Sequence, residues 1–240
     1  MAGPIYQKGK PPGNRYAIMT DMRRCLVLLT AALLAGGTAR AQSPEEAAAN
    51  LEKALRAAGT LQARFEQLHY SMSVSAPLRE RGDLYFQRPD RMRWEYRDPQ
   101  DKVFLFKDGV FEMYIPEDKT LTRSRVSPET YESDILGILL GIRSFAEAYV
   151  IENNPFPTDA ERVRQIRLTP REEGEFSHIL LEIDERTWLL RRAVFIEWAG
   201  NKREFIFSQV RTNVRLSPRI FELKVPPDCE IIDDGETLRR

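Results

Sequence analysis

The chain has few of the residue types that build most catalytic and metal sites. Its 240 residues include only two cysteines and two histidines, His69 and His178. Neither histidine has a second histidine or a cysteine at ligand spacing, whereas a tetrahedral metal site needs several such ligands. The sequence also lacks a Gly-x-Ser-x-Gly elbow and a glycine-rich phosphate loop after a strand. We therefore expect no catalytic residues, no metal and no cofactor.

An excess of positive charge is also missing. The chain holds 36 basic and 36 acidic side chains. Residues 1–41 carry six of the basic and one of the acidic side chains, so the remainder has a net charge of −5. Because phosphate binding needs a basic face, we expect no nucleic-acid partner.

The longest apolar runs are too short to cross a bilayer, and the first of them is typical of an export signal. In residues 22–41, Arg23 and Arg24 form a basic start, residues 26–35 an apolar stretch, and residues 39–41 a small-x-small cleavage site. We predict cleavage after Ala41; the alternative is an uncleaved anchor. Residues 1–21 are interpreted as a leader or a wrongly assigned start, with translation beginning at Met22. Residues 42–240 would then form one exported domain.

Removal of the signal would leave Cys229 as the single cysteine, so no internal disulfide is expected. The mature chain begins with a helix signal, in which Ser43 can cap the helix and Pro44 occupies its first position. Apolar residues recur at helical spacing as far as Ala58, and Gly59 ends the run.

Alternating patterns predict an antiparallel meander rather than alternating strands and helices. The expected strands cover residues 61–74, 80–88, 91–97, 102–107, 110–115, 119–125, 163–170, 177–184, 188–198, 202–213 and 220–225. Asp108-Gly109 is a two-residue hairpin signal. We interpret Asp233 and Asp234 as a frayed tail; the alternative is contact with a cation.

Another helical segment is predicted from Ser127-Pro128 onward. Its residues 134–142 are apolar on nearly every side, so this helix must be covered all round or must face an apolar cavity. Together with the strands it supplies a large apolar set, which we interpret as the lining of a lipid cavity: Phe65, Leu84, Phe86, Met92, Trp94, Phe104, Phe106, Ile135, Leu136, Leu139 and Leu140. The competing interpretation is an ordinary core between sheet and helices.

Arg88 stands at a turn between two aromatic strands, followed by Pro89, which restricts the backbone there. We predict that Arg88 lies at the cavity rim and bonds carbonyl oxygens of the covering helix or of its flanking loops, as a lid latch. A plain surface arginine is the alternative.

Several short patterns occur in a characteristic order along the mature chain. They are Leu61-x-x-x-Phe65-x-Gln67, Gly82-Asp83-Leu84-Tyr85 leading into Arg88-Pro89, Trp94 with Pro99, Asp108-Gly109, Tyr114, Phe221-x-x-x-Val225-Pro226-Pro227 and Ile231-Ile232-Asp233. In this order, behind an export signal, the chain resembles the periplasmic lipoprotein-carrier family, LolA.

The resemblance implies an α+β fold of mostly antiparallel strands, a curved half-barrel sheet with helices covering its concave face. It also implies a monomeric periplasmic carrier that takes acylated lipoproteins from an inner-membrane ABC transporter to an outer-membrane receptor. By position, Arg88 matches the family's lid-latching arginine. The two C-terminal patterns, Phe221-x-x-x-Val225-Pro226-Pro227 and Ile231-Ile232-Asp233, look like the family's closing strand. Met92 departs from an aromatic in the family, and Phe111 and Met113 occupy a strand that usually shows a tryptophan. The alternative function is a lipoprotein sensor or regulator on the same fold, and an envelope hydrolase is disfavoured by the missing catalytic groups.

Overall fold

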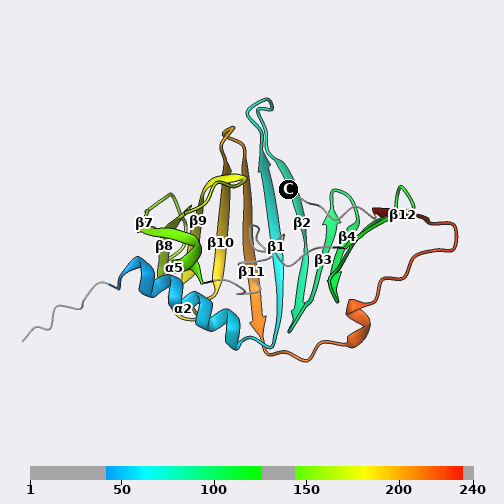
Figure 1. Ribbon diagram of the computed structural model, residues 1–240, viewed down its shortest axis with the longest axis horizontal. Helices are drawn as coiled ribbons and strands as arrows, with labels where there is room; N and C mark the ends of the chain where they lie inside the picture. Colours follow the sequence, from blue (N-terminus) through cyan, green and yellow to red (C-terminus); the bar gives the residue numbers. More distant parts are fainter. Residues whose placement is uncertain (1–41, 126–143, 235–240) are drawn as a thin grey trace, which may run out of the picture. The chain divides into compact units, whose positions relative to one another are not determined.

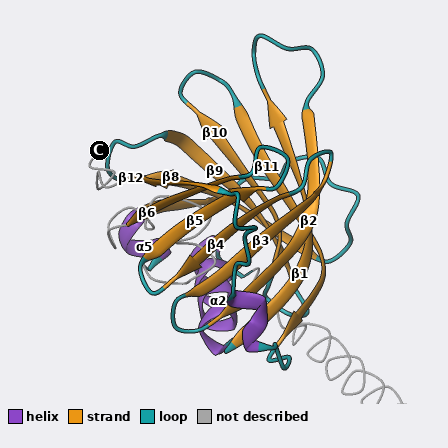
Figure 2. Ribbon diagram, turned by 90° about the vertical axis from the view of Figure 1, so that its right-hand side faces the viewer, coloured by secondary structure: helices purple, strands orange, loops and turns teal. Residues whose placement is uncertain are grey.

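The computed structural model describes residues 42–125 and 144–234. In these residues one open, curved and mostly antiparallel sheet of 12 strands dominates, and helices are few (Figures 1 and 2). The helical elements are α2 (Pro44–Ala57), α5 (Phe145–Ala148) and the 3₁₀ turn η1 (Pro218–Phe221). The strands are β1 (Thr60–Tyr70), β2 (Leu78–Gln87), β3 (Arg91–Asp98), β4 (Lys102–Lys107), β5 (Val110–Ile115), β6 (Thr120–Arg125), β7 (Tyr149–Asn153), β8 (Val163–Pro170), β9 (Phe176–Asp184), β10 (Leu190–Glu197), β11 (Lys202–Thr212) and β12 (Glu230–Asp234). This architecture confirms the predicted fold class.

The strand order is β12-β6-β5-β4-β3-β2-β1-β11-β10-β9-β8-β7. Apart from β12 at one edge, each half of the sheet is a meander of neighbours in sequence. The halves join where β1 pairs with β11, with Phe65 opposite Phe207. The first strand of the chain therefore lies near the middle of the sheet. Segments that are far apart in sequence consequently share one continuous face.

Helix α2 begins as its sequence predicts. The backbone N–H of Glu46 donates to Ser43 Oγ at 3.1 Å, and the backbone N–H of Ser43 donates to Glu46 Oε2 at 3.1 Å, which forms a capping box. Leu51 and Leu55 are buried and join the main apolar cluster. Across the described ranges, no helix is long and apolar enough to cross a membrane.

The tight turns also follow local sequence. Asp108 and Gly109 both have positive φ, 52° and 73°, as a two-residue turn between β4 and β5 requires. Residues 88–90 form the predicted turn between β2 and β3. These positions confirm the predicted hairpins.

The C-terminal prediction was wrong. Residues 220–225 do not form a strand, because Pro218 opens the turn η1 and Phe221 is buried there, only 1% exposed. The final strand is instead β12, which pairs in parallel with β6 and contains Asp233, so this aspartate is not in a frayed tail. The other ten strand pairs are antiparallel.

One strand boundary and two short elements also differ from prediction. Strand β1 ends at Tyr70 rather than near residue 74, because Val74 N–H bonds the Ser71 carbonyl oxygen in a turn. The short elements α5 and β7 were not predicted at all. Four- and five-residue elements offer too few positions for a periodic pattern to be recognised.

Candidate functional site

One face of the sheet carries the predicted apolar residues, and we call it the inner face. Register places Leu84 opposite Trp94 and Phe86 opposite Met92, while Trp94 and Met92 are in turn opposite Phe104 and Phe106. Residues directly opposite in an antiparallel pair share a face. Six of the predicted residues are buried, Phe104 is partly buried, and all seven pack in one cluster: Phe65, Leu84, Phe86, Met92, Trp94, Phe104 and Phe106.

The remaining predicted cavity residues, Ile135, Leu136, Leu139 and Leu140, lie outside the described residues. The sheet and α2 supply further buried apolar residues that were not predicted as part of the cavity lining. Phe205 and Phe207 of β11 and Phe195 of β10 are buried in the same cluster, as are Leu51 and Leu55 of α2. Phe205 and Phe207 are two residues apart within a predicted strand, and this spacing could have identified them as inner-face residues of β11.

Ring contacts show that the inner face is concave. Trp94 on β3 and Phe205 on β11 have ring centroids 5.5 Å apart, although two strands lie between them in the sheet. Three strand spacings amount to about 14 Å on a flat sheet. The side chains therefore meet because the sheet bends toward this face. The Phe65 ring on β1 also contacts Trp94, with the two ring centroids 4.7 Å apart.

Helix α2 closes over part of the inner face. Between them lies an apolar gap of about 10 Å³, lined by Leu55, Leu61, Leu84, Phe207 and other apolar side chains. A gap of this size is barely large enough for one water molecule. At this place an acyl chain can enter only if α2 or the side chains beneath it move.

Arg88 follows β2 and contacts this helix. Its Nη2 donates to the Leu55 carbonyl oxygen near the C-terminus of α2 at 2.9 Å, and its guanidinium lies 5.5 Å from the Phe86 ring centre. Burial, and secondarily the nearby Arg56, lowers the pKa of Arg88. The described contact thus joins the end of β2 to α2, while the predicted covering segment 134–142 lies outside the described residues.

At the other end of β1 the inner face is polar rather than apolar, and five polar side chains meet there. Glu80 is buried and lies 2.5 Å from Lys102 Nζ and 3.3 Å from His69 Nε2. The Tyr96 hydroxyl donates to Gln67 Oε1. The contacts of Glu80 with His69 and Lys102 lower the pKa of Glu80. The hydrogen bond to His69 is the largest cause, the bond to Lys102 contributes further, and burial opposes both. We call this group the polar cluster: Gln67, His69, Glu80, Tyr96 and Lys102.

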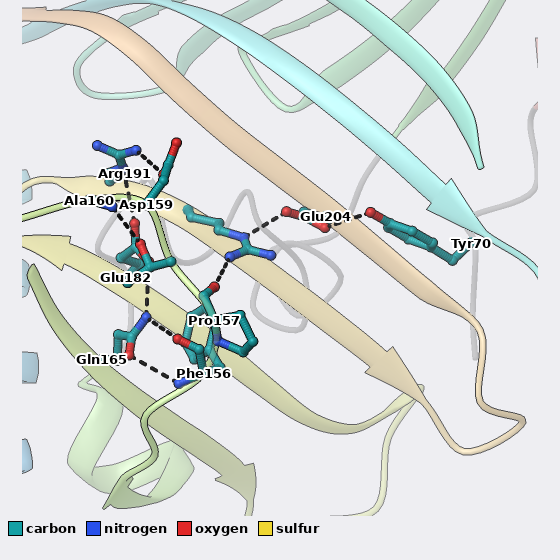
Figure 3. Close-up of polar contacts among 11 residues, drawn as sticks. Tyr70, Phe156, Pro157, Asp159, Ala160, Gln165, Glu182, Arg191 and Glu204 are labelled. Atoms are coloured by element: carbon teal, nitrogen blue, oxygen red, sulfur yellow. Dashed lines mark hydrogen bonds and ion pairs between the residues drawn. The ribbon is translucent and has the colours of Figure 1, made fainter. Parts of the chain in front are cut away.

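The opposite, outer face of the sheet carries a second polar network (Figure 3). Gln165 Nε2 donates to the Phe156 carbonyl oxygen at 2.9 Å and to Glu182 at 3.1 Å. Arg192 donates to Glu204 Oε1 at 2.6 Å and to the Pro157 carbonyl oxygen at 2.9 Å. These bonds hold the loop between β7 and β8 against the sheet, which is a structural rather than a chemical role.

Among the residues that the structure describes, neither His69 nor His178 belongs to a candidate metal site. Within residues 42–125 and 144–234, no three His, Cys, Asp or Glu side chains are grouped so that they could hold a metal ion. On β9, His178 Nδ1 lies 3.0 Å from Ser177 Oγ, and burial lowers the pKa of His178. A cavity of about 130 Å³ near α5 has a mixed lining, in which acidic side chains such as Glu173 and Glu175 lie beside apolar ones such as Phe176 and Ile179.

Comparison with known proteins agrees with this arrangement. The family model described as outer membrane lipoprotein carrier protein LolA matches residues 56–224. An outer-membrane lipoprotein carrier protein of Methylococcus capsulatus is 26% identical over 208 residues, covering 86% of this chain and 97% of the relative. That of Pseudomonas aeruginosa is 23% identical over 213 residues, covering 89% and 100%.

A solved structure supports the fold alone. An uncharacterized conserved protein from Thermus thermophilus superposes with a TM-score of 0.53 at 11% identity, covering 79% of this chain and 98% of that protein. The family match spans the inner-face strands, Arg88 and the polar cluster. The chain belongs to the LolA family of outer membrane lipoprotein carrier proteins.

Proposed function

We propose that this protein is a carrier that holds the acyl chains of lipoproteins against the inner face of its sheet. The observation that supports this most is the continuous apolar lining, contributed by strands β1–β4 and β9–β11 and partly covered by α2. Family membership points in the same direction. A binding role without catalysis accounts for these residues, since each buried methylene of a hydrocarbon contributes about 0.8 kcal/mol and needs no polar partner.

Loading requires an opening step in this proposal. Leu55 and Leu84 border a gap of about 10 Å³ beneath α2, far too small for a lipid tail. We infer that α2 moves aside when acyl chains enter. Met92 suits such a site, because a flexible thioether adapts to hydrocarbon chains of differing shape.

Arg88 would act as the latch of this cover. Its bond to the Leu55 carbonyl oxygen supports that role, because α2 cannot leave the inner face with this bond intact. Breaking this half-buried hydrogen bond costs about 1 kcal/mol, the net value of a typical intramolecular hydrogen bond. Acyl burial is large enough to offset a cost of this size.

The carrier would work in the periplasm as a monomer. We propose that residues 22–41 direct export and are removed, and that residues 1–21 are a leader or lie before the true start. Residues 42–240 would form the single carrier domain. It would receive lipoproteins from an inner-membrane ABC transporter and deliver them to an outer-membrane receptor. A sensor of mislocalised lipoproteins remains the second candidate.

Depletion in the native bacterium tests the carrier against the sensor. If the protein is a carrier, newly made outer-membrane lipoproteins should be retained in the inner membrane, as membrane fractionation would detect. Unchanged lipoprotein sorting with altered envelope-stress signalling would favour the sensor instead. Native mass spectrometry of the protein released gently from the periplasm should show a bound acylated mass. If depletion leaves lipoprotein sorting unchanged and the spectrum shows no bound acylated mass, lipid binding is contradicted.

A further inference from the structure

Two loops that are distant in sequence form one projecting surface, which we call the tip pair. It consists of residues 71–77, between β1 and β2, and residues 198–201, between β10 and β11. Figure 1 shows both loops at the top of the sheet, at the ends of the strands away from α2. They touch: Met72 N–H donates to Asn201 Oδ1 at 3.2 Å. The Met72 sulfur also lies 3.4 Å from where a Cβ on Gly200 would stand.

The tip pair and the adjoining Leu78 expose large apolar side chains. Met72 is 78% exposed, Val74 62%, Leu78 54% and Trp198 71%. In the described ranges there are seven exposed large apolar side chains, and these four are gathered at one end of the sheet. Clustered exposure of this kind marks a surface that contacts a partner or a membrane.

The loop residues of the tip pair carry no charge, although Glu197, the last residue of β10, accepts a hydrogen bond from Asn201 Nδ2 at 3.0 Å. Neither residues 70–78 nor residues 198–201 include a charged side chain, although 30% of the chain is charged. The first charged residues after the tips on β2 and β11 are basic, Arg79 and Lys202. Serines 71, 73 and 75 alternate with Met72, Val74 and Ala76, so the first tip carries apolar side chains separated by small hydroxyls.

Several polar groups within the tips are bonded to the protein. The Trp198 indole N–H donates to the Gly174 carbonyl oxygen at 3.0 Å. Ser73 N–H donates to Ser71 Oγ at 3.3 Å, and Val74 N–H donates to the Ser71 carbonyl oxygen at 3.3 Å. Groups that are already bonded can leave water without losing a hydrogen bond, which hydrocarbon surroundings require.

The base of the tip pair is held in place by the outer face. Tyr70, the last residue of β1, donates its hydroxyl hydrogen to Glu204 on β11 at 3.1 Å (Figure 3). Lys202 lies 5.8 Å from the centre of the same ring. The two hairpins therefore present their tips together, on an anchored base.

We propose that the tip pair inserts into the surface of a lipid bilayer. Two narrow turns offer too little area for a specific protein interface, which buries about 800 Å² per partner, whereas a bilayer demands no matching surface. Met72, Val74, Leu78 and Trp198 enter the interfacial region, where tryptophan is favoured, and Arg79 and Lys202 meet lipid phosphates. Gly174, which accepts the Trp198 hydrogen bond, is flanked by the acidic residues Glu173 and Glu175. Apolar insertion rather than net charge therefore drives the contact. This inference is independent of what the inner face carries.

Vesicle sedimentation tests the insertion. The protein is mixed with vesicles of phosphatidylcholine alone, and with vesicles that also contain phosphatidylglycerol, at low and high salt. We expect binding to both kinds, with little release by salt. The double variant Met72→Ser/Val74→Ser should bind at least tenfold more weakly. The matched control Ile231→Ser/Ile232→Ser, which changes two exposed apolar residues on β12, should bind as the wild type does.

Lipids brominated along their acyl chains provide a second measurement, since they quench only tryptophan that reaches the hydrocarbon. They should quench part of the wild-type emission, and Trp198→Phe should abolish that quenching without abolishing binding. Absence of binding to both vesicle types, equal binding by the double variant, or binding that needs phosphatidylglycerol and disappears in salt would each overturn the inference. Because the vesicles contain no lipoprotein, these outcomes are separate from any failure of the carrier proposal.

Discussion

Gly82 shows how one residue allows the aromatic cluster to form. It lies on β2 directly opposite Phe65 on β1 and opposite Tyr96 on β3. A Cβ at this position would collide with the Glu95 carbonyl oxygen and lie 2.8 Å from Phe65 Cζ. Without a side chain on β2, the Phe65 and Tyr96 rings meet above it with centroids 4.8 Å apart. The glycine therefore provides the space in which neighbouring strands share one packed layer of rings.

The substitution Gly82→Ala should lower the free energy of unfolding by about 1–3 kcal/mol, the usual cost of overpacking. The added methyl group meets backbone, which cannot turn away as a flexible side chain can. Urea denaturation measures the change. Gly174→Ala is the control, because no atom lies within 4 Å of its Cβ position and its stability should match the wild type. Equal stability of the two variants would show that the rings are not packed as described.

At the scale of elements, α2 is joined to the sheet both by packing and by one side chain. Leu51 and Leu55 provide the apolar contact with the inner face. Arg88 adds a directional bond from the end of β2 to the Leu55 carbonyl oxygen. The helix is therefore held at its C-terminal end by a contact that can be removed without emptying the core.

Arg88→Leu should change function more than stability. Leucine keeps the apolar stem and loses the bond to Leu55, so we expect a loss of about 1 kcal/mol or less in unfolding free energy. Transfer of a fluorescent acylated peptide from one membrane to another should be blocked, at either uptake or release. Arg186→Leu, in the exposed turn between β9 and β10, is the control and should transfer normally. Normal transfer by Arg88→Leu would rule out the latch.

At the scale of the whole molecule, the polar cluster connects folding to pH. Glu80 is buried on the inner face, and its pKa is lowered from 4.5 mainly by His69 and then by Lys102. A lowered folded-state pKa means that the carboxylate stabilises the fold above its unfolded-state value. That contribution is lost as the pH falls through the folded-state pKa.

The stability of the wild type should therefore decrease on acidification from neutral pH to below pH 4.5, the ordinary value for this group. Glu80→Gln should be less stable than the wild type at neutral pH and should lose less stability over the same interval. Urea unfolding at each pH measures both. Parallel pH profiles of the two proteins would show that Glu80 does not carry this dependence.

Part of the candidate site could be predicted because strand alternation is local. Leu84, Phe86, Met92 and Trp94 share a face by their own spacing, whichever strands pair with them. Phe207 belongs to the same cluster through β11, but its place opposite Phe65 depends on pairing between the two halves of the chain. No local pattern specifies that pairing, since it depends on many weak contacts between distant segments.

The amino-acid sequence by itself determined the start of α2, the turn at Asp108-Gly109 and the alternating faces of most strands, since each depends on residues within a few positions. Only the tertiary structure decided that β1 lies beside β11, that β12 pairs in parallel at the edge, and that Met72 meets Asn201. These features require segments that are far apart to come together, and the free energy that selects one such arrangement is spread over the whole sheet.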